Sequence, residues 1–234
     1  MRYGTIQEIK KYGDKLKSQK NAFWHALIIT IIIFAIGIYA GIIIENLRTE
    51  KIDKLYQNSE IDLLDIRLQS EIYTSRNFNC NLAITENIKF TNRVYEEAKK
   101  LGKYEKASRI TNSIKLQHKK YDLLRFIILL NSIKIKEKCP NPYYEVVYFY
   151  DYDNPSIEKK AKQEVFSKLL IQLKNKMNNE VLLIPISGDA NLGSLKLFLE
   201  EHKIAEENLP VILIDRKIKV DKIQNIDDLL KYFE

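Results

Sequence analysis

The sequence is poor in the residues that build metal sites, disulfide frameworks and flexible linkers. Its 234 residues include 2 cysteines and 3 histidines, too few for a four-thiolate zinc site or for a small secreted domain held by several disulfides. Only 7 glycines and 5 prolines occur, which leaves little room for a low-complexity linker. With 29% charged residues and a mean hydropathy of −0.29, the chain is neither a multi-pass membrane protein nor disordered. We expect no cofactor and no metal.

The net charge of +7 is concentrated at one end of the chain. Residues 1–21 carry six basic and two acidic side chains, so more than half of the net charge lies in this segment. The rest of the chain has no concentrated basic stripe of the kind that nucleic-acid-binding proteins present. We therefore expect no nucleic-acid partner and interpret residues 1–21 as a basic tail.

One long apolar run follows the tail. Residues 26–44 read ALIITIIIFAIGIYAGIII, 19 residues in which Thr30 is the only ordinary polar one. As a helix the run measures about 28 Å, close to the thickness of a bilayer core, where the backbone must satisfy its own hydrogen bonds. The sequence predicts a transmembrane helix over residues 22–45. A cleaved signal peptide has a shorter apolar region that ends in small residues, so we interpret the segment as an uncleaved signal anchor.

The flanks of this helix predict its orientation. Residues 45–65 carry three basic and six acidic side chains, against six basic ones in the tail. Because basic residues stay on the cytoplasmic side, we expect a single-pass protein of the cell membrane with its N-terminus in the cytoplasm and its C-terminal part outside. Gly37 and Gly41 have the spacing that lets two membrane helices approach closely, and a homodimer is an alternative that the sequence leaves open.

Residues 46–140 predict a helical stalk outside the membrane, as a hairpin, a small bundle or a coiled coil. Apolar residues recur at spacings of three and four and mark one helix face: Ile61, Leu64, Leu68 and Ile72. The pattern pauses at residues 76–81 and breaks near Gly102, where we expect a helix to end. A last helix over residues 105–136 contains LLRFIILL, which is too short and too charged to cross a membrane. We expect this stretch to be buried between the other helices and the C-terminal domain.

The two cysteines lie at helix ends in this scheme. Cys80 falls in the break between helices, and Cys139 follows the last helix. Outside the cytoplasm they can form a disulfide, and an up-and-down hairpin brings both to the same end of the stalk. Two unpaired thiols and an intermolecular bridge at Cys80 are the alternatives.

Strand and helix patterns alternate over residues 141–234. Four strands and three helices are predicted in the order β-α-β-α-β-β-α, with strands at residues 145–150, 181–187, 211–215 and 217–220 and helices at 155–177, 191–202 and 227–233. Strands separated by helices predict a largely parallel sheet that ends in a hairpin. His118 and His202 are isolated on separate helices, and we predict both as surface residues.

This order resembles the thioredoxin-like superfamily, and two local features carry the resemblance. The first strand runs into a helix through four residues at the place of the redox motif: Asp153, Asn154, Pro155 and Ser156. Leu209 and Pro210 precede the third strand, like the cis-proline that faces the active-site loop in this superfamily. The resemblance implies a shallow groove between these segments, which in catalytic relatives pairs with an extended peptide.

The departures from the superfamily pattern exclude its chemistry. Asp153 and Ser156 replace both motif cysteines, so this site has no thiolate for thiol–disulfide exchange. We therefore expect a redox-inactive binding or structural protein that is anchored in the lipid bilayer by its N-terminal helix and binds a protein partner or client. One alternative is a membrane-tethered thiol–disulfide protein that uses Cys80 and Cys139. The other is a dimeric membrane scaffold.

Overall fold

The chain forms two compact units, Met1–Lys54 and Leu55–Glu234, and each is described by itself. The computed structural model describes residues 4–75, 77–107, 112–140 and 143–233, and among these the side chains of 4–22, 48–49, 51–56, 58–59, 100–107 and 112–114 lie outside the description. Helix α1 (Gly4–Ser75) contributes residues to both units. The basic side chains of residues 1–21, which carry the predicted orientation, lie outside the described residues, and that orientation stays a prediction.

The apolar helix predicted near the N-terminus is present within α1. Phe23–Leu47 is long and apolar enough to cross a membrane, with a mean hydropathy of 2.9. The Thr30 hydroxyl donates to the carbonyl oxygen of Ala26 at 2.8 Å, which satisfies this polar side chain within the helix itself. Gly37 and Gly41 have open space where a Cβ would lie. The predicted packing of two helices at these glycines stays a prediction.

Three helical segments form a small bundle in the second unit. They are the last turns of α1, α2 (Cys80–Ala107) and α3 (Asn112–Lys138). The amide of Asn131 in α3 donates to the carbonyl oxygen of Ile66 in α1 at 3.3 Å, and the Tyr121 hydroxyl of α3 donates to Glu97 of α2 at 3.3 Å. Together with the cysteine pair described below, these contacts show that α3 runs parallel to α1 and antiparallel to α2.

Helix α1 packs through a different face from the apolar one that the sequence marks. The four side chains of that stripe are 50–68% exposed: Ile61, Leu64, Leu68 and Ile72. The bundle instead buries Asp62, Ile66 and Tyr73 of α1. Asp62 pairs with Arg93 of α2 at 2.7 Å. An ion pair therefore contributes to the contact between α1 and α2, for which the sequence predicted apolar side chains. Periodicity finds an apolar face but does not say which face has a partner.

Helix α2 continues through Gly102 to Ala107, so the helix end predicted at Gly102 is wrong. A single glycine inside a helix costs only about 1 kcal/mol relative to alanine, which the flanking helix-forming residues offset. The last helix consequently begins at Asn112.

The C-terminal part holds a four-stranded mixed sheet in the order β2-β1-β3-β4. The strands are β1 (Tyr144–Tyr150), β2 (Val181–Ser187), β3 (Val211–Ile214) and β4 (Ile218–Val220). Only β1 and β2 are parallel, whereas β3 is antiparallel to β1 and to β4. The expectation of a largely parallel sheet is therefore wrong, because the order of strands and helices along the chain does not fix the direction of β3.

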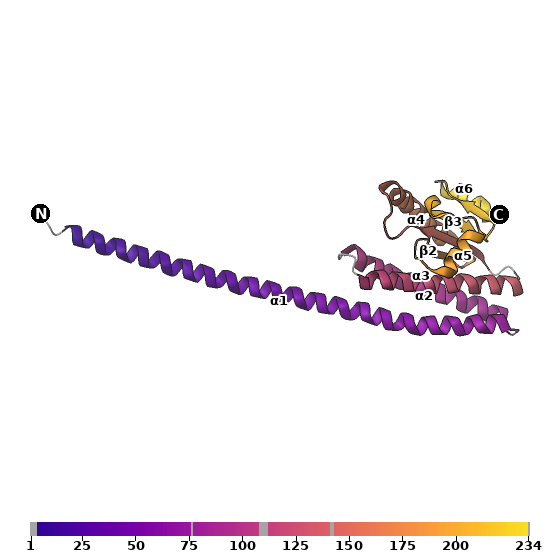
Figure 1. The fold of residues 1–234 in the computed structure, drawn as a ribbon, viewed down its shortest axis with the longest axis horizontal. Coiled ribbons are helices and arrows are strands. Elements are labelled where there is room, and N and C mark those ends of the chain that lie inside the picture. The colour runs from indigo at the N-terminus through magenta and orange to yellow at the C-terminus, as the bar shows by residue number, and fades with distance from the viewer. Residues whose placement is uncertain (1–3, 76, 108–111, 141–142, 234) are drawn as a thin grey trace. The chain divides into compact units, whose positions relative to one another are not determined.

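Helices cover both faces of this sheet (Figure 1). On one face lie α4 (Ile157–Met177), which leads into the short 3-10 helix η1 (Asn178–Glu180), and α6 (Ile226–Leu230), which leads into η3 (Lys231–Phe233). On the other lie α2, α3 and α5 (Gly193–Glu201), and η2 (Glu206–Asn208) precedes β3. The buried residues of the LLRFIILL stretch join this second core beside Val147 and Phe149: Leu124, Phe126, Ile128 and Leu129. Their predicted burial is confirmed. The predicted domain limits at residues 46–140 and 141–234 stay sequence interpretations.

A buried carboxyl group lies where the bundle meets the sheet. Glu145 of β1 is fully buried, with Arg216 Nε 3.5 Å from its Oε1. Burial raises the pKa of Glu145, and the Ser132 hydroxyl and the Arg216 guanidinium only partly oppose that rise. The protonated form is therefore favoured by folding. The resulting stabilisation is complete below the pKa of the unfolded chain and is lost as the pH rises through the folded pKa.

We predict that Glu145→Gln is more stable than the wild type at pH 8, by about 1–2 kcal/mol, because it removes a buried charge whose partners satisfy it incompletely. The gain should shrink as the pH is lowered toward 4.5. Urea unfolding of the full chain in detergent at several pH values measures it. Exposed Glu164→Gln on α4 is the matched control. Parallel pH profiles for Glu145→Gln and the wild type would contradict the assignment.

Candidate functional site

The four residues that the resemblance aligns with a redox motif, Asp153–Ser156, are called the motif segment below. They connect β1 to α4, and Ser156 is the N-cap of that helix, since its hydroxyl accepts the backbone N–H of Lys159 at 3.2 Å. Asp153 takes no part in this cap and extends its carboxylate to Lys115 of α3.

A second carboxylate fixes the backbone just before the motif segment. Asp189, in the loop after β2, accepts the backbone N–H of Tyr152 at 3.0 Å and that of Asp153 at 2.7 Å, and also the Ser187 hydroxyl. Burial alone would raise the pKa of Asp189, but these donors outweigh it and hold that pKa below its usual value. The Asp189 carboxylate therefore has a structural role, in which it accepts hydrogen bonds from donors of its own chain.

The loop before β3 comes close to the same place. The Leu209–Pro210 peptide is cis. Lys159 of α4 donates to the carbonyl oxygen of Glu206 at 3.2 Å, three residues before Leu209. A Cβ on Gly188 would lie 2.7 Å from Leu209 Cδ1, so the loop after β2 also lies against this segment. These contacts place the loop before β3 next to the loop after β2 and to the first turn of α4, and a peptide groove between them stays a prediction.

Burial separates the predicted groove residues into two sets. Leu209 is 2% exposed and Pro210 is buried as well, so these side chains belong to the core. Asp153, Asn154 and Ser156 are exposed and Pro155 is half-buried, while Ile157, the first residue of α4, is 90% exposed. The accessible side chains in this region are therefore those of the motif segment and Ile157. Nothing in the sequence pattern singled out Ile157.

His118 of α3 lies at the centre of a polar cluster, so its prediction as a surface residue is wrong. Its Nδ1 lies 2.9 Å from Asp122 Oδ2, its Nε2 lies 3.0 Å from the Tyr150 hydroxyl, and its ring stacks on Tyr152 at 3.5 Å. Asp122 is fully buried and accepts the Ser187 N–H and an Arg125 N–H, each at 3.1 Å. The spacing of His118 and Asp122 places them on one helix face, which is the one sequence signal for this cluster.

A pocket of about 190 Å³ opens between this cluster and the motif segment, and we call it the His118 pocket. Its walls come from α3, from the end of β1 and from the loop after β2, and they include Lys115, His118, Lys119, Asp153, Asp189 and Asn191. An open groove of about 730 Å³ lies on the other side of the same loop and shares Asp189 and Asn191 with the pocket. Together they offer room for a chain segment with one group turned inward.

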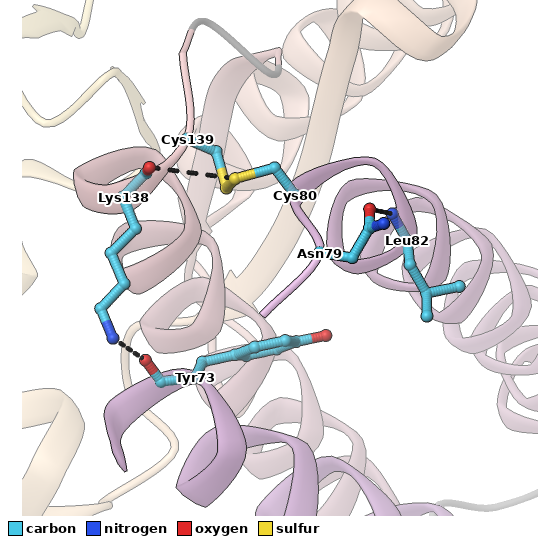
Figure 2. The surroundings of a disulfide bond; sticks show 6 residues. All are labelled: Tyr73, Asn79, Cys80, Leu82, Lys138 and Cys139. Carbon is cyan, nitrogen blue, oxygen red and sulfur yellow. Dashed lines mark hydrogen bonds between the residues drawn. A yellow bond between two sulfur atoms is a disulfide. The ribbon is translucent and has the colours of Figure 1, made fainter. Parts of the chain in front are cut away.

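The cysteine pair lies elsewhere in the bundle (Figure 2). The sulfur atoms of Cys80 and Cys139 are 1.99 Å apart, at the disulfide distance, which is the intrachain pairing that the sequence favoured. Asn79 caps the start of α2 by accepting the Leu82 N–H at 3.1 Å, and Lys138 donates to the Tyr73 carbonyl oxygen at 2.6 Å. The ends of α1, α2 and α3 are thereby tied together at one place.

This pair does not take part in the His118 pocket. Cys139 and His118 are 21 residues apart along the chain, about 30 Å of helix. Cys139 is also 4% exposed, which leaves a substrate disulfide little access to its sulfur. The pair ties the bundle together, and the alternative redox use of Cys80 and Cys139 draws no support from this geometry.

We predict that Cys80→Ser with Cys139→Ser lowers the free energy of unfolding by about 4 kcal/mol, because the crosslink closes a loop with a sequence separation of 59 residues. The measurement is urea unfolding of the full chain in detergent. Dithiothreitol should destabilise the wild type by a similar amount and leave the double variant unchanged. Equal stability of the oxidised wild type and the double variant would refute the crosslink.

Among the side chains that the structure describes, no group of three or more His, Cys, Asp or Glu residues is arranged to hold a metal ion. The chain matches no protein-family model, no curated protein and no solved structure. The candidate site presents exposed residues at the motif segment, the exposed apolar side chain of Ile157 and charged side chains in the adjoining pocket.

Proposed function

We propose that this chain is a membrane-anchored protein that holds a redox-inactive thioredoxin-like domain outside the cytoplasm and binds an extended polypeptide at the motif segment. The order β-α-β-α-β-β-α, with β1 and β2 parallel and β3 and β4 antiparallel, supports the thioredoxin-like part of this proposal. The cis peptide before β3 supports it as well. The serine cap and the aspartate at the cysteine positions argue against redox chemistry there.

The membrane part of the proposal rests on the apolar helix and on charge. Phe23–Leu47 is long enough to span a bilayer, and the basic tail favours a cytoplasmic N-terminus. A disulfide within residues 55–234 agrees with a compartment outside the cytoplasm, where such bonds persist.

We predict that protease added to intact cells removes a tag from the C-terminus and leaves a tag on the N-terminus intact. The reason is that the basic flank stays inside during insertion. Immunoblotting of both tags measures the result, with detergent-lysed cells as the control in which both tags are cleaved. Loss of the N-terminal tag alone would show that the topology is the opposite of the one proposed.

The single observation that carries the binding role is the exposure of Ile157. An isoleucine that is 90% exposed at the first position of α4, directly after the motif segment, makes little contact with its own fold. Burial of such a side chain by a ligand contributes about 1.5–3 kcal/mol. A polypeptide that lies along the motif segment would cover it and pair with nearby backbone groups.

We predict that Ile157→Ser weakens binding of an extended peptide about tenfold without changing stability, because the side chain is lost to the ligand and not to the core. The probe is a fluorescent eight-residue peptide of valine and threonine with both ends blocked, titrated by anisotropy against the full chain in detergent. Leu197→Ser, at a 71% exposed leucine of α5, is the matched control and should bind like the wild type.

Two results would contradict the proposed function. One is the absence of binding by the wild type at any concentration tested. The other is an equal effect of Ile157→Ser and Leu197→Ser, which would show that binding does not use the motif segment.

A further inference from the structure

Two lysines of α3 face the His118 pocket from consecutive helical turns. Lys115 pairs with the carboxylate of Asp153 in the motif segment. Lys119 donates to the backbone carbonyl oxygen of Asn191 at 3.2 Å. Residues four apart lie on the same side of a helix, so the two ammonium groups can bind the same functional group of a ligand.

The other charged groups around the pocket are already paired within the fold. Asp189 is held by the Ser187 hydroxyl and two backbone N–H groups, and Asp122 by His118, Arg125 and the Ser187 N–H. Arg125 balances the charge of Asp122, whereas Asp189 keeps its negative charge, because the donors that hold it are neutral. The lysines differ, because their partners are a neutral carbonyl and a carboxylate that is itself 53% exposed.

The Lys115–Asp153 pair is also the contact most easily exchanged. Both side chains are about half exposed, 45% for Lys115 and 53% for Asp153, and exposed ion pairs of this kind are weak. A ligand carboxylate that reached Lys115 and Lys119 together would make charge-assisted hydrogen bonds to both. Such a ligand can replace Asp153 at little cost.

We propose that the His118 pocket binds a carboxylate of the polypeptide at the motif segment, and that Asp153 competes with it from within the chain. This inference rests on the proposed function and adds the chemistry of the ligand. Lys115 and Lys119 are the recognising residues, and the carboxylate belongs either to an acidic side chain or to the C-terminus of the ligand. Asp153 is the internal substitute that the ligand displaces.

The competition makes opposite predictions for neighbouring residues. Lys115→Gln combined with Lys119→Gln should weaken binding of an acidic peptide about tenfold or more, because both donors of positive charge are lost. Asp153→Asn should strengthen binding of the same peptide by about threefold, because the competing carboxylate is gone. A general effect of net charge would shift the affinities in the same two directions, so Lys168→Gln and Glu164→Gln, at exposed sites of α4, measure that general effect, and the changes at the pocket should exceed it.

The test uses the full chain in detergent and four eight-residue peptides of one valine and threonine sequence. The central position is either aspartate or asparagine, and the C-terminus is either free or amidated. We expect the double lysine variant to lower the affinity for carboxylate-bearing peptides to that of the neutral peptide. If the affinity depends on the central aspartate, the carboxylate comes from a side chain of the ligand. If the affinity depends on the free C-terminus, the carboxylate is the terminal one.

The two proposals fail in different ways. If all four peptides bind equally and the lysine and Asp153 variants change nothing, while Ile157→Ser still weakens binding, the carboxylate pocket is refuted and the proposed function stands. If acidic peptides are favoured but Lys168→Gln weakens them as much as the double variant does, the pocket is refuted as well. If no peptide binds, both proposals are refuted.

Discussion

The packing of α3 against the sheet is the constraint on which the rest of the second unit depends. Leu124, Ile128 and Leu129 are completely buried there, and each fully buried leucine or isoleucine side chain contributes about 1.5–3 kcal/mol. The same helix also contacts α1 and α2, so one element belongs to both the bundle and the α/β layer. The unit Leu55–Glu234 therefore contains both the helical bundle and the sheet, and α3 packs against each of them.

This arrangement explains why polar groups gather along α3. A helix buried between two layers must satisfy every polar side chain that it carries inward. Arg125, nearly buried within an otherwise apolar stretch, is held by Asp122, and Asp122 in turn accepts the backbone N–H at the end of β2. Hydrogen bonds of this kind fix the register of the helix against the sheet. They also bring His118 and Lys115, one or two turns earlier, to the edge where β1 and β2 end.

The sequence predicts elements well and their mutual placement poorly, for physical reasons visible at particular residues. The apolar span, the four strands and the burial of residues 123–130 follow from local hydrophobicity, and the structure contains all of them. The exposed stripe from Ile61 to Ile72 and the direction of β3 depend on which surfaces meet, and local periodicity carries no information about that. Of the candidate site, the motif segment rests on the resemblance and stays a prediction, whereas the contribution of α3 depends on tertiary packing that local sequence patterns do not encode.

The two ends of α3 make different kinds of contact. At its C-terminal end the cysteine pair and the Lys138 contact tie three helix ends together, which limits how far the helix can slide. Toward its N-terminal end the lysines and His118 meet a loop whose own contacts, through Asp153 and Tyr152, are made largely to α3 and Asp189. A ligand that competes for these contacts would act on the loop, while the helix, held at its far end and along its apolar face, stays in place. The displacement of Asp153 that we propose requires this combination, in which α3 is held in place while the exposed Lys115–Asp153 ion pair can be replaced by a ligand.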